Sequence, residues 1–201
     1  MSETKRNNHY EPVIDGGNIE PYNLKPSTEF VHYIPTAIKS GGNETIYRQD
    51  RICIRQIGAT PVATFVPANI FTLNTIYNAY LKENNLADLK FLLRVITSKA
   101  TKYFWKKNSS DEKKTFPKIK KEAILSIPVP TINKQNKNLH DEIAKLVNQL
   151  LQLNQQKAET KLATQVSQLQ GKIEYCESRI NEIVYQLYGL TAEEIKIVEC
   201  K

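Results

Sequence analysis

The sequence predicts an α+β fold, with a sheet-rich body over residues 1–138 followed by a long, coiled-coil-like helical region over residues 139–201. Two observations lead to this prediction. Turn signals built from glycine, proline and asparagine separate short β-prone runs in the first 85 residues. Residues 139–188, in contrast, contain no proline and a single glycine, and their apolar side chains repeat at heptad spacing. A chain of 201 residues with 40% hydrophobic content is long enough to form a domain with its own core.

Three runs in the first part predict strands. Residues 51–57 (RICIRQI) alternate in polarity, so that Ile52 and Ile54 share one face of a strand. Residues 61–66 (PVATFV) and 71–76 (FTLNTI) are rich in β-branched and aromatic side chains, which fit a pleated, half-buried surface. We therefore expect each of these runs to be a strand.

A helical pattern follows the strands. Between residues 86 and 107 the apolar side chains recur at helical spacing, which predicts an amphipathic helix whose basic residues lie mostly off the apolar stripe. Residues 108–114 (NSSDEKK) predict a loop. Residues 118–127 lie between prolines and predict one helical turn that runs into an extended piece.

The last region carries a heptad seam. Its core positions follow one another at alternating spacings of four and three residues, which is typical of paired helices. The positions are Leu162, Val166, Leu169, Ile173, Cys176, Ile180, Ile183 and Leu187. Such a seam predicts pairing within the chain or with a second chain, and the alternative is an ordinary helix packed on the body.

The seam breaks near residues 154–161, because an earlier apolar series over residues 139–153 runs in a different phase. Two structures explain the break: an antiparallel helical hairpin that turns there, or one helix of about 50 residues with a shift in register. We favour the hairpin. Gly189 is expected at the C′ position of its last helix, and residues 191–194 (TAEE) predict the capping box of a short final turn.

Positive charge is concentrated in one segment. The chain has a net charge of +7, yet residues 90–121 alone hold 11 basic and 2 acidic residues, while residues 139–201 hold 7 basic and 9 acidic ones. A concentrated basic segment predicts a polyanionic partner. A solvated basic face without a partner is the alternative.

Composition also excludes several classes. The first twenty residues lack the apolar core of a secretory signal, and every apolar run is too short to cross a membrane. The three cysteines, Cys53, Cys176 and Cys200, are scattered and odd in number, which argues against a disulfide framework or a zinc site. We therefore expect a cytoplasmic protein without a membrane partner or a bound metal.

Catalytic motifs are absent from the sequence. It contains neither a glycine-rich phosphate loop nor a G-x-S-x-G elbow, and its three histidines have no metal-ligand spacing. The alternative is a metal-dependent nuclease that uses Asp88 and Asp111 beside Lys113, although such acidic triplets are frequent in charged loops. The prediction is a chain that is not an enzyme and has no cofactor of its own.

Several strings, taken in order, resemble one known family. They are RQIG (55–58), TLNT (72–75), LL and SK (92–93 and 98–99), TFPKIKK (115–121), IPVP (127–130), IVYQLYGLT (183–191) and EEIKIVE (193–199). Their order and spacing resemble the TaqI-like C-terminal specificity domain. This is the target-recognition domain of type IIG restriction–modification methyltransferases specific for adenine, and it is related to the specificity subunits of type I systems. The resemblance runs from about residue 16 to residue 199.

The resemblance implies a target-recognition body that reads a short sequence in the DNA major groove, and a helical spacer that holds the body at a fixed distance from a catalytic domain or from a second recognition half. Fused family members also carry an S-adenosylmethionine loop and an Asn-Pro-Pro-Tyr-type tetrad, which this sequence lacks. The implied partners are therefore double-stranded DNA and a DNA methyltransferase domain or subunit that binds S-adenosylmethionine. The chain would be a fragment, a degenerate gene or a natural half-subunit, and a homodimer would read a palindrome.

Two sets of residues are the candidate DNA contacts. Lysines in or beside the basic loop would neutralise phosphates, and these are Lys106, Lys107, Lys113, Lys114, Lys118, Lys120 and Lys121. Forked donors and acceptors of the β part would read bases, and these are Arg48, Arg51, Arg55, Gln56 and Asn74. For each member of the second set the alternative is a structural role.

A different class of function remains open. The heptad seam also fits an adaptor or decoy that pairs with a methyltransferase subunit without reading DNA. Such a protein would keep the seam and bind DNA only weakly and without sequence preference. Sequence-selective binding therefore discriminates the two hypotheses.

Overall fold

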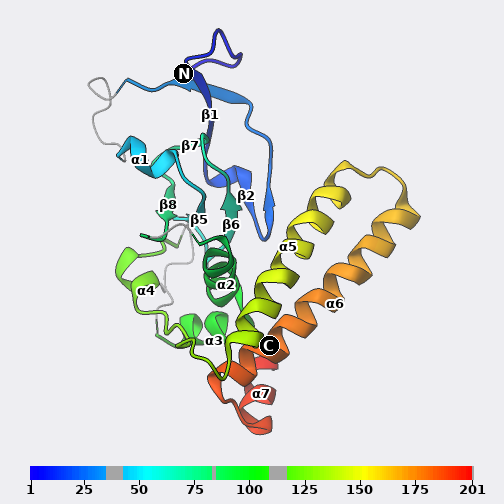
Figure 1. The fold of residues 1–201 in the computed structure, drawn as a ribbon. Coiled ribbons are helices and arrows are strands. Elements are labelled where there is room, and N and C mark those ends of the chain that lie inside the picture. Colours follow the sequence, from blue (N-terminus) through cyan, green and yellow to red (C-terminus); the bar gives the residue numbers. More distant parts are fainter. Residues whose placement is uncertain (35–42, 83–84, 109–116, 201) are drawn as a thin grey trace.

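The structure is a computed structural model that describes residues 1–34, 43–82, 85–108 and 117–200. Small sheets form the first part of the chain and long helices the second, which confirms the predicted α+β class (Figure 1). The N-terminus lies on the far side of the sheets from the helices α5, α6 and α7 that end the chain (Figure 1).

The central sheet has the strand order β6-β5-β8, and both outer strands run antiparallel to β5. Its strands are β5 (Arg51–Arg55), β6 (Ala63–Val66) and β8 (Ile76–Ala79). The predicted alternation along β5 is confirmed. Ile52 and Ile54 join the main core on one face, while Cys53 joins a smaller core on the other face.

Two further sheets precede or flank the central one. In the first, β1 pairs antiparallel with β4 and parallel with β7, and the second is a two-stranded ribbon of β2 and β3. Their bounds are β1 (Tyr10–Ile14), β2 (Ile19–Glu20), β3 (Asn23–Leu24), β4 (Glu29–His32) and β7 (Phe71–Thr72). The short helices η1 (Gly16–Asn18) and α1 (Glu44–Tyr47) lie in the connections.

The prediction of one strand over residues 71–76 is wrong. The run divides into β7, which pairs with β1, and β8, which pairs with β5. Residues 74 and 75 form a turn between the two strands. Both halves of the run are strands, as its β-prone composition predicts, but they belong to two different sheets.

The prediction of one helix over residues 86–107 is also wrong, because Ser98 divides it into α2 (Leu86–Thr97) and α3 (Lys99–Asn108). The Ser98 backbone is extended, with ψ at 157°. Its hydroxyl donates to the carbonyl of Val95 at 2.9 Å and accepts from the amide of Thr101 at 3.1 Å. One side chain thus closes the first helix and caps the second.

The predicted antiparallel hairpin is confirmed. Helix α5 (Lys137–Glu159) and helix α6 (Ala163–Tyr188) pack against each other, and the chain turns at residues 160–162 (Figure 1). Gly189 ends α6 in the left-handed conformation, with φ at 66°. The capping box of Thr191 and Glu194 opens α7 (Ala192–Glu199) as predicted. The short helix α4 (Lys121–Leu125) matches the predicted single turn.

The heptad seam of α6 faces α5 and the body within the same chain. Its central positions are buried, namely Ile173, Cys176, Ile180 and Ile183, whereas Val166, Leu169 and Leu187 are half-buried. Leu162 is 60% exposed, and the prediction for this residue is wrong. It is the N-cap residue of α6, so its backbone leaves the helix before its side chain can reach the seam.

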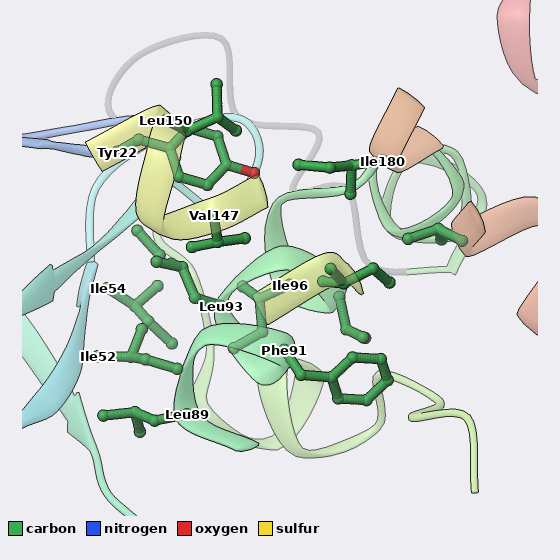
Figure 2. Packing of buried hydrophobic residues seen from close by; sticks show 14 of the residues in the cluster. Tyr22, Ile52, Ile54, Leu89, Phe91, Leu93, Ile96, Val147, Leu150 and Ile180 are labelled. Carbon is green, nitrogen blue, oxygen red and sulfur yellow. The ribbon is translucent and has the colours of Figure 1, made fainter. Parts of the chain in front are cut away.

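Helix α2 joins the sheet to the hairpin. Figure 2 shows side chains from β5, α2, α5 and α6 gathered in one cluster, with Leu93 of α2 near the centre. Ile54 comes from the sheet, while Val147 and Ile180 come from the two helices of the hairpin. The base of the hairpin is therefore part of the core of the body. Among the described residues, no helix is both long and apolar enough to cross a membrane.

This packing predicts that Ile180→Lys destabilises the protein, whereas Leu162→Lys at the same seam does not. Ile180 is fully buried, so the variant leaves a charge in the core at a cost of about 3 kcal/mol or more. The exposed Leu162 serves as the matched control, with an expected change within about 0.5 kcal/mol. Urea unfolding followed by circular dichroism measures both. Equal stability of the two variants would contradict the described core.

Candidate nucleic-acid interface

Loops from distant parts of the chain meet where β5 ends. The Gln56 amide donates to the carbonyl of Thr75 at 2.9 Å, which joins the end of β5 to the turn before β8. The Gly16 amide donates to the hydroxyl of Thr75 at 3.0 Å, which adds the loop before β2. An ideal Cβ on Gly16 would lie 3.6 Å from Thr75, an ordinary contact distance, so this approach does not require glycine.

A fourth segment completes this edge of the sheet. The Ile119 amide donates to the carbonyl of Gln56 at 2.9 Å, and the Gly58 amide donates to the carbonyl of Pro117 at 3.0 Å. The Tyr77 hydroxyl also donates to the carbonyl of Ile119 at 3.0 Å. We call this edge the loop surface and define it as residues 15–18, 55–60, 73–75 and 117–121.

The fixed position of Ile119 orients its neighbours. Ile119 is buried in the main core, and the backbone on both sides is extended, so successive side chains point in opposite directions. Lys118 and Lys120 are accordingly exposed, as is Lys121 at the start of α4. The buried side chain of Ile119 thus fixes a segment of four residues, 118–121, whose three lysines are exposed to solvent.

The lysines of the phosphate set have no counter-ions in the part of the chain that the structure describes. Lys106 and Lys107 are exposed in the last turn of α3, and the Lys107 ammonium lies 5.8 Å from the ring centroid of Tyr103. Several other basic side chains are ion-paired, namely Lys25, Arg48, Lys99, Lys137 and Arg179. Lys113 and Lys114 lie outside the described residues. The described members of the set can therefore meet an anion without first breaking an internal salt bridge.

Three of the base-reading candidates lie at the loop surface. Asn74 is exposed in the turn between β7 and β8, next to Thr75. Gln56 is half-buried, and its side-chain amide donates to the carbonyl of Ile76 over a long 3.4 Å. Arg55 is half-buried at the end of β5. The backbone hydrogen bonds of Gln56 to Ile119 and Thr75 thus bring Gln56 and Asn74 close to the segment that carries Lys118, Lys120 and Lys121.

Arg51 does not have the position that base reading requires. The residue is fully buried, and its Nε donates to Asn78 Oδ1 at 2.8 Å. Its terminal nitrogens donate to the carbonyls of Gln49, Pro67 and Ile70. Burial also lowers the pKa of this guanidinium. Arg51 therefore holds the ends of the central strands together and has no exposed donor for a base.

Arg48 lies apart from the loop surface, at the C-terminal end of α1. Its guanidinium pairs with Glu11 at 3.0 Å and with Glu44 at 2.9 Å, and these two carboxylates raise its pKa. It also donates to the side chain of Asn69 at 2.9 Å. This arginine would have to leave two carboxylates to contact a base.

Two parts of the loop surface were not among the predicted DNA contacts. They are residues 16–18 and Thr75, both of which lie within the family resemblance. The missed signal is the pair Asp15 and Asn18, which forms a capping box: the Gly17 amide donates to Asp15 Oδ1 at 2.7 Å, and the Asp15 amide donates to Asn18 Oδ1 at 2.9 Å. Such a locally braced turn is a rigid support for a recognition loop.

The nuclease alternative gains no support from the geometry. Asp88 Oδ1 lies 2.9 Å from Nε2 of the buried His140, and Asp111 lies outside the described residues. Within residues 1–34, 43–82, 85–108 and 117–200, no group of three histidine, cysteine or acidic residues is placed to hold a metal ion. Asp88 therefore connects α2 to α5.

Comparisons with known proteins place this geometry in a family. A family model, the TaqI-like C-terminal specificity domain, matches residues 11–129. No curated protein matches the sequence significantly. Among solved structures, the type IIL restriction–modification enzyme MmeI in complex with DNA is similar with a TM-score of 0.61 at 12% sequence identity. The similarity covers 94% of this chain and 30% of the MmeI chain, so this chain spans less than a third of that protein.

The two comparisons carry different weight. At 12% identity, the likeness to MmeI shows a shared fold. The family match includes β1, the central sheet, α2, α3 and α4, and therefore all but the helical hairpin and the final helix of the elements described above. Because this match spans more than half of the chain, the protein belongs to the family of TaqI-like C-terminal specificity domains.

Proposed function

We propose that the chain is a DNA-recognition module of a restriction–modification system, which reads a short duplex sequence and directs a DNA adenine methyltransferase to it. The observation that carries the proposal is the loop surface, where exposed lysines without an ion pair among the described residues meet polar side chains in a member of a specificity-domain family. The DNA complex of MmeI, which shares the fold, supports the same role.

The lysines supply affinity and register. Lys118, Lys120 and Lys121 project from an anchored segment, so the backbone that carries them is already ordered before DNA binds. Each contact with a phosphate releases condensed counter-ions from the duplex, which favours binding at low salt and carries no sequence information. Lys106 and Lys107 extend the same positive charge to the end of α3.

In this proposal, polar side chains of the loop surface read the bases. An asparagine or glutamine amide makes two hydrogen bonds with adenine, and an arginine makes two with guanine. Asn74 is the best placed, because it is exposed at the tip of a turn. Gln56 would exchange one long bond to Ile76 for a base contact. Arg55 lies at the start of the same loop.

The chemistry belongs to a partner in this proposal. A methyltransferase domain or subunit would bind S-adenosylmethionine and transfer the methyl group, while this chain, itself not an enzyme, positions the DNA. The hairpin of α5 and α6 would serve as the spacer, since its base is built into the core of the body. A single module reads one half of a bipartite site, and two copies related by a two-fold axis would read a palindromic pair.

Selection from a random duplex pool tests the proposal. The full chain is incubated with the pool at about 0.15 M salt, where phosphate contacts are weakened and base contacts gain weight. We expect one short motif to be enriched after sequencing. Binding without enrichment, repeated in the presence of a methyltransferase subunit, would favour the adaptor or decoy that pairs with that subunit.

A second prediction concerns the phosphate contacts. Replacing Lys118, Lys120 and Lys121 by alanine should weaken binding to all sequences and reduce the slope of log K against log salt by up to about 2.7, or roughly 0.9 for each lost contact. The matched control replaces Lys145, Lys161 and Lys172, which are exposed lysines of the hairpin, and makes the same change in net charge. Fluorescence anisotropy at four salt concentrations gives both slopes. Equal slopes for the two triple variants would remove the loop surface as the phosphate contact.

A further inference from the structure

A guanidinium is buried in the core, and among the described residues it forms no ion pair with a carboxylate. Arg94 on α2 is 3% exposed. Its Nη1 donates to the Tyr22 hydroxyl at 2.7 Å, and its Nη2 donates to Asn181 Oδ1. Among the described residues, its Nε has no hydrogen-bond partner. Both partners are neutral, whereas an arginine side chain stays charged in proteins, so the positive charge is solvated only by dipoles.

The hydrogen bonds around Arg94 run in one direction. Since the guanidinium can only donate, the Tyr22 hydroxyl accepts from it and donates its own proton to Thr97 Oγ1 at 2.6 Å. The Thr97 hydroxyl then donates to the carbonyl of Leu93 at 2.9 Å. The chain of bonds ends on the helix backbone and supplies no negative charge.

A small cavity lies against this network. Its volume is 120 Å³, and its lining includes Tyr22, Arg94, Thr97, Lys102 and Asn181. At about 30 Å³ for each water, the cavity has the room of roughly four waters, which suits a single phosphate-sized group with a water.

The charges at the cavity are predominantly positive. Arg94, Lys99 and Lys102 line it, and Glu177 is the acidic residue in its lining. Lys99 is already paired with Glu199. Partial burial lowers the pKa of the Lys102 ammonium, and the charge of Arg94 lowers it further, while Glu177 acts in the opposite direction. Arg94 and Lys102 therefore repel each other across a space that Glu177 alone does not neutralise.

We propose that this cavity binds a small tetrahedral oxyanion of the phosphate type, held by Arg94 and Lys102. Such an ion supplies the negative charge that the network lacks, and its oxygens accept from guanidinium and ammonium groups together. The ion is either free inorganic phosphate or one phosphate of a DNA backbone. The cavity shares Thr60 with the loop surface, but the proposal does not depend on the proposed function.

The position of the cavity gives the ion a structural role. The lining residues come from the turn between β2 and β3, from the loop between β5 and β6, from α2 and α3, and from α6. A bound oxyanion therefore connects the body to the base of the hairpin. Because it binds the folded chain, it raises the melting temperature in proportion to the logarithm of its concentration once the site is saturated.

Thermal unfolding of the full chain tests the site. Melting temperatures are measured with inorganic phosphate and, separately, sulfate up to about 10 mM, below the range in which these kosmotropic anions stabilise folded proteins in general. Sodium chloride at matched ionic strength is the reference. We expect both oxyanions to raise the melting temperature and chloride to have no comparable effect. An equal response to all three salts would overturn the proposal and leave a cavity filled by water.

Two variants with opposite expected effects sharpen this test. Lys102→Met should weaken the apparent phosphate affinity about tenfold, through loss of one charge-assisted hydrogen bond. Glu177→Gln should strengthen that affinity, because it removes the carboxylate that repels the anion. Neither side chain has a hydrogen bond or ion pair among the described residues, so both variants should fold.

Lys145→Met on α5, outside the cavity lining, is the control and should respond to phosphate as the unmodified chain does. Unchanged affinity in both test variants would contradict the site.

The source of the ion is distinguished by competition. Binding of a duplex DNA is measured with and without inorganic phosphate at constant ionic strength. If phosphate competes with DNA in the unmodified chain, and competes about tenfold less well in Lys102→Met, the cavity takes a backbone phosphate. If DNA binding is unaffected while the melting temperature still rises, the cavity takes free phosphate. Both results support an oxyanion site, whereas the absence of oxyanion-specific stabilisation overturns it.

Discussion

The packing of α2 between the central sheet and the hairpin is the contact on which the rest of the structure depends. Five of its twelve residues are buried apolar side chains, namely Leu89, Phe91, Leu93, Val95 and Ile96. A helix that is apolar on several sides requires neighbours on several sides. The sheet covers it through Ile52 and Ile54, and the hairpin covers it through Val147 and Ile180. The sheet-rich body and the helical hairpin are therefore held by one core, and a change in α2 affects both.

Local patterns predicted the parts of the fold that depend on local chemistry. The alternation of residues 51–57 identified β5. The change of heptad phase predicted a break near residues 154–161, and the chain turns at residues 160–162. Gly189 and the capping box of Thr191 were also identified, since each depends on a few adjacent residues. The break at Ser98 was not predicted, because the apolar stripe continues across it and the two bonds of one hydroxyl decide it.

The candidate site depends on contacts between distant residues, and these are the features that sequence patterns do not contain. The basic segment predicted Lys118, Lys120 and Lys121, but their place beside Gln56 and Thr75 follows from hydrogen bonds that span about 20 to 60 residues of sequence. Arg51 and Arg55 belong to one strand and look alike in the sequence. Asn78 of β8 and three backbone carbonyls accept from the guanidinium of Arg51 and enclose it, whereas Arg55 ends the strand. The tertiary structure therefore separates two residues that the sequence does not distinguish.

The attachment of the hairpin at one end has a consequence for its dynamics. Its buried residues all lie near the base, up to Leu150 on α5 and from Ile173 on α6. Residues 151–172, all of which the structure describes, are exposed or half-buried. Amide hydrogens near the turn are then expected to exchange with solvent through local fraying, while those at the base exchange only when the whole core opens. Protection of the amide hydrogens from exchange is thus expected to fall along the hairpin, from the end that joins the body to the turn at residues 160–162.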